Sequence, residues 1–335
     1  MNKTAAFIMP VKIEGNEMEL RHLHEAIDSI KNQTDPDWII VISEDFSDDK
    51  RVYDELEKIK ADLKEKIHII YADRNHGTGV ARNIGIRYAA EIGAPFILYN
   101  DADDLSDPRR LELVRKAFDA DPTVNVVYTS FDVIDENGTL TPLDEVSPSV
   151  REIILGHYND PVVGENAWIN IVTKKKYTNL TSCTAVKTSL AVEEPFPPTS
   201  VSEDCHTWFR YGAHPGKFVL LTEIKGGYRI RRGAASRSRS NFLDFYEQMY
   251  NVDSDGFEQA LKVAKKYGTL GGWTENDLRA AFHVRVALTI LHGASEKYAK
   301  KSLEISMKNS QNTFSYIDAL DCPEEEKATL KALIS

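Results

Sequence analysis

Apolar and polar positions alternate in blocks along the first part of the chain. Apolar residues recur at helical spacing in four stretches, which predicts helices over 20–32, 50–66, 79–92 and 109–119. Strands that are apolar on both faces and alternate with helices are typical of a parallel sheet covered on each side. An α/β fold is predicted, and its buried strands are expected at five continuous apolar runs: Ala5–Val11, Trp38–Ser43, Ile67–Tyr71, Phe96–Tyr99 and Val124–Tyr128.

The pattern changes beyond residue 140. Residues 140–240 are less regular, with several prolines, the pair Gly226-Gly227 and a basic, serine-rich loop at 231–240. Helical spacing returns near 243 and predicts helices over 257–267, 275–291, a stretch ending near 308, and 323–333. We therefore expect an α/β domain over residues 1–240 and a helical region over 241–335. That region could cover the sheet, contact a membrane surface or form a homodimer.

Charged loops follow the first four predicted strands. They span residues 10–16, 44–49, 73–79 and 100–104. In parallel α/β sheets, ligands bind beyond the carboxyl ends of the strands, where such loops meet. The sequence therefore predicts a ligand site built by these loops.

Composition narrows the class of ligand. The net charge of −11 over 335 residues argues against a nucleic-acid partner, because phosphate backbones bind basic surfaces. An anionic ligand would need a metal ion or a local cluster of Lys and Arg. The three cysteines lack zinc-binding spacing. The start of the chain lacks a signal-peptide pattern and no apolar run has transmembrane length, so we expect a cytoplasmic protein, free or peripheral to the membrane.

The run Asp101-Ala102-Asp103-Asp104 comes directly after the fourth predicted strand and Asn100. Two carboxylates at positions i and i+2 can converge on a hard divalent cation, which prefers oxygen ligands and leaves positions for phosphate oxygens. The alternative is a solvated acidic turn, and spacing alone favours neither. The preceding buried strand and the three other charged loops favour the metal site.

Five segments occur in an order that matches a known enzyme family: Pro10-Val11, residues 44–49, Arg82-Asn83-Ile84-Gly85, residues 101–104 and Ser202-Glu203-Asp204. Over about residues 4 to 240, the chain resembles the inverting family 2 glycosyltransferases of the GT-A fold. The resemblance implies a Rossmann-like, mostly parallel sheet, a nucleotide diphosphate sugar donor (a UDP-sugar above all) and Mg²⁺ or Mn²⁺ as cofactor. It implies hexosyl transfer to a hydroxyl of a glycan, a lipid-linked acceptor or a small molecule.

The resemblance also implies roles for individual residues. Asp103 would bind the metal directly, and Asp101 would contact the ribose and support the metal. Asp104 is expected only to shape the turn, and Asp204 would be the catalytic base. The donor would be bound by residues from four segments: Pro10, Val11, Glu14, Asp45 on the base or ribose, Arg82 beside Asn83, Asp101 and Ala102.

The surroundings of Asp204 fit a base and also fit a simpler role. Inverting transfer needs one base that removes the proton of the acceptor hydroxyl while its oxygen attacks the anomeric carbon. Glu203-Asp204 also stands at a predicted helix start, where carboxylates stabilise the helix dipole. Without the resemblance, a helix-capping pair is the commoner explanation.

The chain departs from the family pattern at two places. Phe46 stands where the family has glycine in its Asp-Asp-Gly-Ser motif, and Glu44 replaces the first aspartate. We therefore expect either a different turn backbone or an aromatic ring against the nucleotide. Farther along, where a histidine ligand would be expected, Arg231 or Arg232 could bind the diphosphate through paired hydrogen bonds. A solvated basic loop fits this charge pattern equally well.

Acceptor binding is expected in the irregular middle of the chain. Glu203, Trp168 and Trp208 are the candidates, since aromatic rings stack on sugars, although core packing explains a tryptophan equally well. Two other functions stay open. A nucleotidyltransferase also uses paired aspartates on a parallel sheet, but residues 10–15 are a poor version of its glycine-rich loop. A non-catalytic nucleotide-sugar-binding module would not depend on Asp204.

Overall fold

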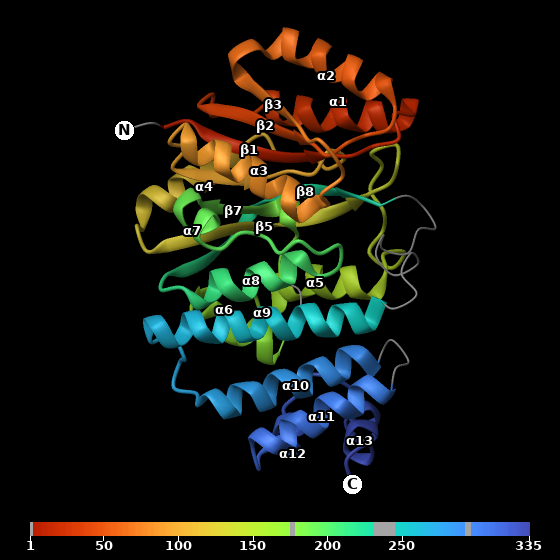
Figure 1. Cartoon of the computed structure of the whole chain (residues 1–335), viewed down its shortest axis with the longest axis vertical. Helices are drawn as coiled ribbons and strands as arrows, with labels where there is room; N and C mark the ends of the chain where they lie inside the picture. The colour runs from red at the N-terminus through yellow and green to blue at the C-terminus, as the bar shows by residue number, and fades with distance from the viewer. Residues whose placement is uncertain (1–2, 175–177, 231–244, 292–295) are drawn as a thin grey trace. The chain divides into compact units, whose positions relative to one another are not determined.

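The computed structural model describes residues 3–174, 178–230, 245–291 and 296–335 (Figure 1). Contacts within the chain divide it into two compact units. The second unit joins the C-terminal helices to two segments from the irregular middle of the sequence. The first unit comprises Met1–Val163, Asn179–Ser200 and Phe218–Arg237, and the second comprises Gly164–Thr178, Val201–Lys217 and Ser238–Ser335.

A sheet with helices on both faces forms the first unit. Its strands lie in the order β3-β2-β1-β4-β7-β5-β8. The pairs β3–β2, β2–β1 and β1–β4 are parallel, whereas β7 is antiparallel to both β4 and β5. The predicted strands are confirmed, and they are β1 (Ala5–Val11), β2 (Trp38–Glu44), β3 (Ile67–Tyr71), β4 (Phe96–Tyr99) and β5 (Val124–Ile134), joined by β7 (Thr184–Lys187) and β8 (Lys217–Arg229).

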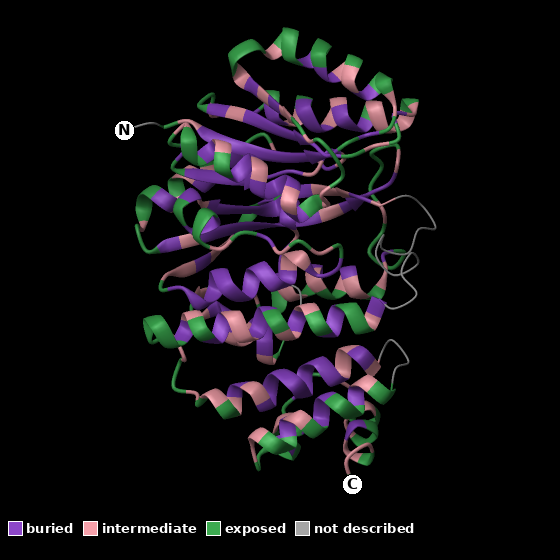
Figure 2. Ribbon diagram, viewed as in Figure 1, coloured by how far each residue is buried: buried purple, intermediate pink, exposed green. Residues whose placement is uncertain are grey.

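Helices cover both faces of this sheet because alternate strand residues point to opposite sides. Phe7 and Met9 of β1 pack in one core with the apolar faces of three helices, α1, α2 and α4. Ile8 faces α3, where a Cβ on Gly85 would lie 2.9 Å from Ile8 Cγ2. The central strands are accordingly buried along most of their length (Figure 2). The helices are α1 (Glu17–Lys31), α2 (Lys50–Leu63), α3 (Thr78–Glu91), α4 (Arg110–Ala120), α5 (Pro148–Asn159) and α7 (Thr188–Glu193), with 3-10 turns at Lys64–Lys66 and Thr181–Cys183.

Helices make up most of the second unit. α8 packs against α6 and α9, and α10 packs against α11. The rings of Phe257 and Phe282 stack between α9 and α10 with their centroids 4.2 Å apart. Among the described residues, no helix has the length and apolar content needed to cross a membrane. The elements are β6 (Gly164–Glu165), α6 (Ala167–Thr173), α8 (Glu203–Ala213), α9 (Phe245–Tyr267), α10 (Glu275–Leu291), α11 (Glu296–Asn309), α12 (Thr313–Asp318) and α13 (Glu324–Ala332).

The middle of the chain is more regular than its sequence indicates. β8 is a strand of 13 residues that contains Gly226-Gly227. A Cβ on Gly226 would lie 2.7 Å from the Sγ of Cys183, and Gly227 forms an antiparallel bridge with Leu105. These glycines therefore allow close approach of neighbouring segments within a strand, where the sequence favoured a break.

Candidate active site

The acidic turn Asp101–Asp104 lies at the carboxyl end of β4, where the sequence predicted a site. Asp104 N donates to Asp101 O (3.2 Å), and Asn100 Nδ2 donates to the same carbonyl (3.0 Å). Asp101 and Asp103 are partly exposed, whereas Ala102 and Asp104 are buried. The closed turn therefore leaves two carboxylates accessible, at positions i and i+2.

Asp104 supports the turn from inside. Its Oδ1 accepts a hydrogen bond from Arg229 N (2.9 Å). Burial, followed by repulsion from the Asp101 carboxylate, raises the pKa of Asp104 to about 7. A carboxyl group enclosed in this way is suited to holding the turn rather than to binding a ligand in solvent.

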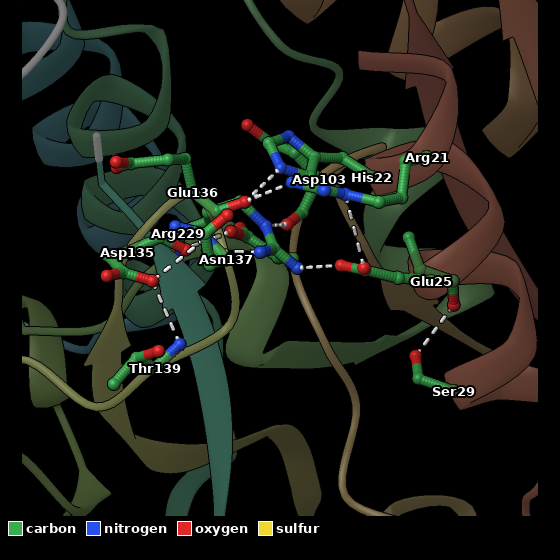
Figure 3. A network of polar contacts seen from close by, with 12 residues as sticks. Arg21, His22, Glu25, Ser29, Asp103, Asp135, Glu136, Asn137, Thr139 and Arg229 are labelled. Atoms are coloured by element: carbon green, nitrogen blue, oxygen red, sulfur yellow. Dashed lines mark hydrogen bonds and ion pairs between the residues drawn. The ribbon is translucent and has the colours of Figure 1, made fainter. Parts of the chain in front are cut away.

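Arg229 ties the acidic turn to two other parts of the first unit (Figure 3). Its Nε donates to Asp103 O (2.8 Å), its Nη1 to Asp135 O (3.1 Å) and its Nη2 to the Glu25 carboxylate (2.7 Å). All three guanidinium nitrogens are thus engaged within the protein. No sequence pattern singled out Arg229 or Glu25 for this role, and Arg231 and Arg232, which were expected to bind the diphosphate, lie outside the described residues.

Arg82 supports Asp101 from α3. Its Nη2 lies 2.9 Å from Asp101 Oδ1, and its side chain is almost fully buried. The guanidinium also stands over the Phe196 ring, with 5.3 Å from Cζ to the ring centroid. The neighbouring Asn83 fixes the same segment, because its amide exchanges two hydrogen bonds with the Phe196 backbone. The Arg82-Asn83 pair therefore orders the surroundings of the acidic turn.

Asp45 joins the loops that follow β2 and β3. Its two carboxylate oxygens accept hydrogen bonds from His76 N and Gly77 N, both at 2.8 Å. The side chain is buried. A role on the nucleotide base or ribose stays a prediction, and the structure adds that Asp45 sets the spacing of the two loops.

Phe46 keeps the backbone conformation that glycine favours. Its φ is 63°, in the left-handed region, and its ring is 44% exposed. The Glu44 carboxylate accepts from Phe46 N (3.3 Å) and Ser47 N (2.6 Å), and Lys12 Nζ donates to Phe46 O (2.9 Å). The turn therefore presents an exposed ring on a backbone conformation that glycine favours, and both expectations, a turn backbone different from the family's and a ring against the nucleotide, stay predictions.

Three of the residues expected to bind the donor are buried in the structure. Pro10, Val11 and Ala102 are buried, and the side chain of Val11 belongs to the core beneath the sheet. Their role in binding the donor stays a prediction, and the structure adds that their side chains pack within the first unit. Glu14 is exposed, and its backbone N–H donates to the Glu19 carboxylate (2.7 Å).

Asp204 lies in the first turn of α8, in the second unit. It is partly exposed, and its Oδ1 accepts from Cys205 N (2.7 Å). Ser202, two residues before Asp204, has a left-handed backbone conformation with φ 59°. Ser202 makes no capping bond to α8; its hydroxyl instead donates to the buried Asp253 carboxylate of α9 (2.6 Å). The start of α8 is therefore fixed from outside the helix.

The two tryptophans expected at an acceptor site lie in the interior. Trp168 and Trp208 are both 0% exposed. Trp168 packs near Phe257, and its Nε1 donates to Thr269 O (3.0 Å). Stacking on an acceptor is therefore corrected to core packing for both rings. Glu203, partly exposed beside Asp204, stays a candidate.

Asp101 and Asp103 fit a cation that brings further ligands with it. Among the described residues, no group of three His, Cys, Asp or Glu side chains converges as a metal cage. Mg²⁺ is commonly held by one or two carboxylates together with substrate phosphates and waters. Two accessible carboxylates on one closed turn have the chemistry for that kind of site.

Comparison with known proteins identifies the family. The model of the family described as glycosyl transferase family 2 matches residues 7–179, which is more than half of the chain. This chain belongs to glycosyl transferase family 2. It is therefore a glycosyltransferase, and the predicted enzyme class is confirmed.

Relatives and solved structures agree with this family. The chain is 27% identical over 229 residues to an uncharacterized glycosyltransferase, MJ1057, of Methanocaldococcus jannaschii, covering 68% of this chain and 70% of that protein. It is 27% identical over 126 residues to the putative teichuronic acid biosynthesis glycosyltransferase TuaG of Bacillus subtilis, covering 37% of this chain. The chain thus spans only 46% of TuaG.

The fold matches solved enzymes of low sequence identity. S. aureus TarS 1-349 in complex with UDP-GlcNAc aligns with a TM-score of 0.56 at 15% identity, over 95% of this chain and 92% of that one. The mannosyltransferase PcManGT from Pyrobaculum calidifontis, in complex with GDP-Man and Mn²⁺, aligns with a TM-score of 0.50 at 16% identity, over 99% and 78%. The predicted GT-A fold with a C-terminal helical region is confirmed.

Proposed function

We propose that this family 2 enzyme transfers a sugar from a UDP-sugar to an acceptor hydroxyl, with inversion at the anomeric carbon and with Mg²⁺ or Mn²⁺ as cofactor. The observation that carries the proposal is the pair of accessible carboxylates, Asp101 and Asp103, on the closed turn after β4. The nucleotide sugars bound by TarS and PcManGT, and the Mn²⁺ in the latter, support a nucleotide diphosphate donor and a divalent cation.

The donor would be held at the carboxyl ends of the parallel strands. Asp103 and Asp101 would hold the cation, which offsets the charge of the diphosphate and stabilises it as a leaving group. Arg82 fixes the direction of the Asp101 carboxylate through their ion pair. Arg229 and Asp104 hold the backbone of the turn, so that the two carboxylates keep their spacing.

Asp204 would act as the base in a single displacement. Its carboxylate takes the proton of the acceptor hydroxyl while that oxygen bonds to the anomeric carbon. The bond between this carbon and the diphosphate oxygen breaks, and the nucleotide diphosphate leaves with the bonding electrons. Because the acceptor attacks from the face opposite the leaving group, the anomeric configuration inverts.

Nucleotide-dependent thermal stability tests the donor and metal site. The melting temperature would be measured with UDP, GDP or dTDP, in Mn²⁺, Mg²⁺ or EDTA. A ligand at 100 times its Kd stabilises the folded state by about 2.7 kcal/mol. We expect UDP to raise the melting temperature with a cation present, and Asp103→Asn to lose that increment. Asp119→Asn, which removes an exposed carboxylate from α4, is the control with the same change in net charge.

The proposal fails if no nucleotide stabilises the protein under any of these conditions. It also fails if Asp103→Asn and Asp119→Asn respond alike to UDP with Mn²⁺. Stabilisation by GDP or dTDP in place of UDP would overturn the UDP assignment alone and leave the metal site standing.

Substitution of the base tests the chemistry separately. In Asp204→Asn the donor should still bind, since the change lies outside the acidic turn, but turnover should fall by about 10²–10⁴-fold. Asp321→Asn, which removes an exposed carboxylate between α12 and α13, is the matched control and should keep most of the activity. Release of UDP from UDP-GlcNAc reports turnover, and the anomeric configuration of the product by NMR reports inversion. Full activity in Asp204→Asn would remove this residue from the mechanism.

A further inference from the structure

Ser202 is held in a strained conformation by a partner on another helix. A non-glycine residue at φ 59° is strained, and such residues persist where their surroundings over-determine them. Ser202 is buried, and its hydroxyl donates to Asp253 Oδ1 at 2.6 Å. Asp253 itself is 1% exposed. The strain at Ser202 is thus tied to a carboxylate in the middle of α9.

Asp253 is in turn paired with a buried cation on α10. Arg285 Nη1 lies 4.0 Å from Asp253 Oδ2, and both side chains are almost fully buried. The Arg285 guanidinium stands over the ring of Phe282, with 5.1 Å to the centroid, and its Nε donates to Val172 O (3.2 Å). The Asp253 carboxylate is thus the anion nearest to a buried guanidinium whose two Nη atoms have no hydrogen-bond partner among the described residues, so the pair couples α9 to α10 by charge alone.

The contact between α8 and α9 leaves little room for movement. A Cβ on Gly256 would lie 2.8 Å from ring atoms of His206 and 2.9 Å from its Cα. His206 Nε2 also lies 3.0 Å from Asp255 Oδ2. The two helices therefore meet closely just beyond Ser202 and Asp253, which fixes where α8 starts.

We propose that Asp253 and Arg285 are positioning residues that hold Ser202 in its left-handed conformation and thereby set the direction of Asp204 at the start of α8. This inference rests on the proposed function, because it assumes that Asp204 is the base. It gives the C-terminal helices α9 and α10 a part in the reaction, through the turn that carries the base. The chain of contacts lies entirely within the second unit.

Substitutions of two buried serines separate an effect on the position of Asp204 from a general loss of stability. Ser202→Ala removes the hydroxyl that bonds Asp253. Ser302→Ala is the matched control, because Ser302 is fully buried and its hydroxyl donates to His283 O (2.9 Å), joining α11 to α10 without reaching α8. We expect both variants to lower the melting temperature. Only Ser202→Ala should lower kcat, by tenfold or more, with KM for UDP-GlcNAc and the Kd of UDP within twofold of wild type.

Three more variants test whether Asp253 acts on Asp204 through Ser202. In Ser202→Gly the left-handed conformation carries no strain, so part of the lost kcat should return although the hydroxyl is still missing. In an Asp204→Asn background, Ser202→Ala should cause no further loss, because residues that act as one unit are not additive. Asp253→Asn should lower kcat as Ser202→Ala does.

Hydrogen exchange tests the anchoring whichever donor the enzyme takes. Amides of residues 203–208 should exchange at least tenfold faster in Ser202→Ala than in wild type, and at the wild-type rate in Ser302→Ala. Equal exchange in the two variants overturns the inference, as does an equal loss of kcat. If Asp204→Asn abolishes turnover while Ser202→Ala leaves it unchanged, only the positioning role fails. If Asp204→Asn keeps full turnover, the proposed base fails and the inference with it.

Discussion

Phe46 has an aromatic side chain on a backbone conformation that favours glycine. Its left-handed φ of 63° is stabilised by hydrogen bonds at both of its backbone polar groups, to Glu44 and from Lys12. The left-handed region costs an L-residue roughly 1–2 kcal/mol. The turn after β2 therefore holds an aromatic residue in a backbone conformation that usually selects glycine.

Glycine and alanine at this position should differ in a defined direction. Phe46→Gly and Phe46→Ala both remove the ring, but only alanine keeps a Cβ in the left-handed region. We expect the glycine variant to be more stable by about 1 kcal/mol, measured by urea unfolding. Ala61→Gly in helix α2 is the control, because the loss of a Cβ there should cost about 1 kcal/mol. An alanine variant as stable as the glycine variant would contradict the strain at Phe46.

Single residues differ in how much of their role the sequence reveals. The departure at Phe46 is visible because the motif around it is otherwise recognisable. Glu25 carries no such signal, since a glutamate on an amphipathic helix fits any solvated face, and only the fold brings it within 2.7 Å of Arg229. The burial of Trp168 and Trp208 likewise depends on contacts that are distant in the sequence.

At the scale of elements, β8 depends on two glycines that the sequence pattern cannot interpret. A glycine pair is more often a break than part of a strand. In this sheet, Gly226 faces Cys183 so closely that a Cβ would lie 2.7 Å from its Sγ. The strand is therefore specified by its neighbours, not by its own propensity.

Two glycine-to-alanine changes should have opposite effects. Gly226→Ala forces a Cβ against Cys183, and we expect a loss of about 1–3 kcal/mol in the free energy of unfolding. Gly156→Ala in α5 meets no neighbouring atom within 4 Å and should stabilise by about 0.4–1 kcal/mol. Urea unfolding of the two variants decides this. If Gly226→Ala is neutral, β8 does not approach Cys183 as described.

Strands and helices are harder to predict from the sequence beyond the first half of the chain, and the reason is physical. The strands β1, β3 and β4 have the predicted bounds, because parallel strands buried on both faces are continuous apolar runs that can be recognised locally. α9 starts at Phe245, close to residue 243, where helical spacing was expected to return. β8 escapes such recognition, because its apolar residues are interrupted by polar ones and partners far along the sequence decide its structure.

At the scale of the whole molecule, the two compact units interleave in sequence. Residues 164–178 and 201–217 belong with the C-terminal helices although they fall within the predicted α/β domain. No local pattern marks them, since their partners come later in the chain. The boundary at residue 240, a homodimer through the helical region and a peripheral membrane location stay predictions.

Buried and partly buried histidines give the chain a shared response to acid. Burial is the largest influence on each, and it lowers the pKa of His22, His68, His206 and His283 below the ordinary value. For His283 the pKa falls to about 4. Around this ring Glu258 acts to raise the pKa, while Arg285 and Arg279 act to lower it.

The contribution of these histidines to stability should fall between pH 6.5 and pH 4. In that window the unfolded chain binds a proton at His283 that the folded chain does not, so this contribution to the free energy of unfolding decreases as the pH falls. The shift of His283 from 6.5 to about 4 corresponds to about 3 kcal/mol, fully present above pH 6.5 and lost near pH 4. Asp104 acts in the opposite direction, because its raised pKa lets the folded chain take up a proton there before the unfolded chain does. Urea unfolding from pH 7.5 to 4.5 therefore compares the wild type with a variant that lacks the His283 ring.

The variant His283→Asn isolates the contribution of this one ring. Asparagine can keep a hydrogen bond to the Ser302 hydroxyl, which lies 3.0 Å from His283 Nδ1, but it takes up no proton. We expect lower stability than that of the wild type at pH 7.5, because packing is lost, and a smaller difference from the wild type at pH 4.5. The variant and the wild type should thus converge as the pH falls. Parallel curves would mean that His283 does not carry the acid response, which would then have to come from the other buried histidines.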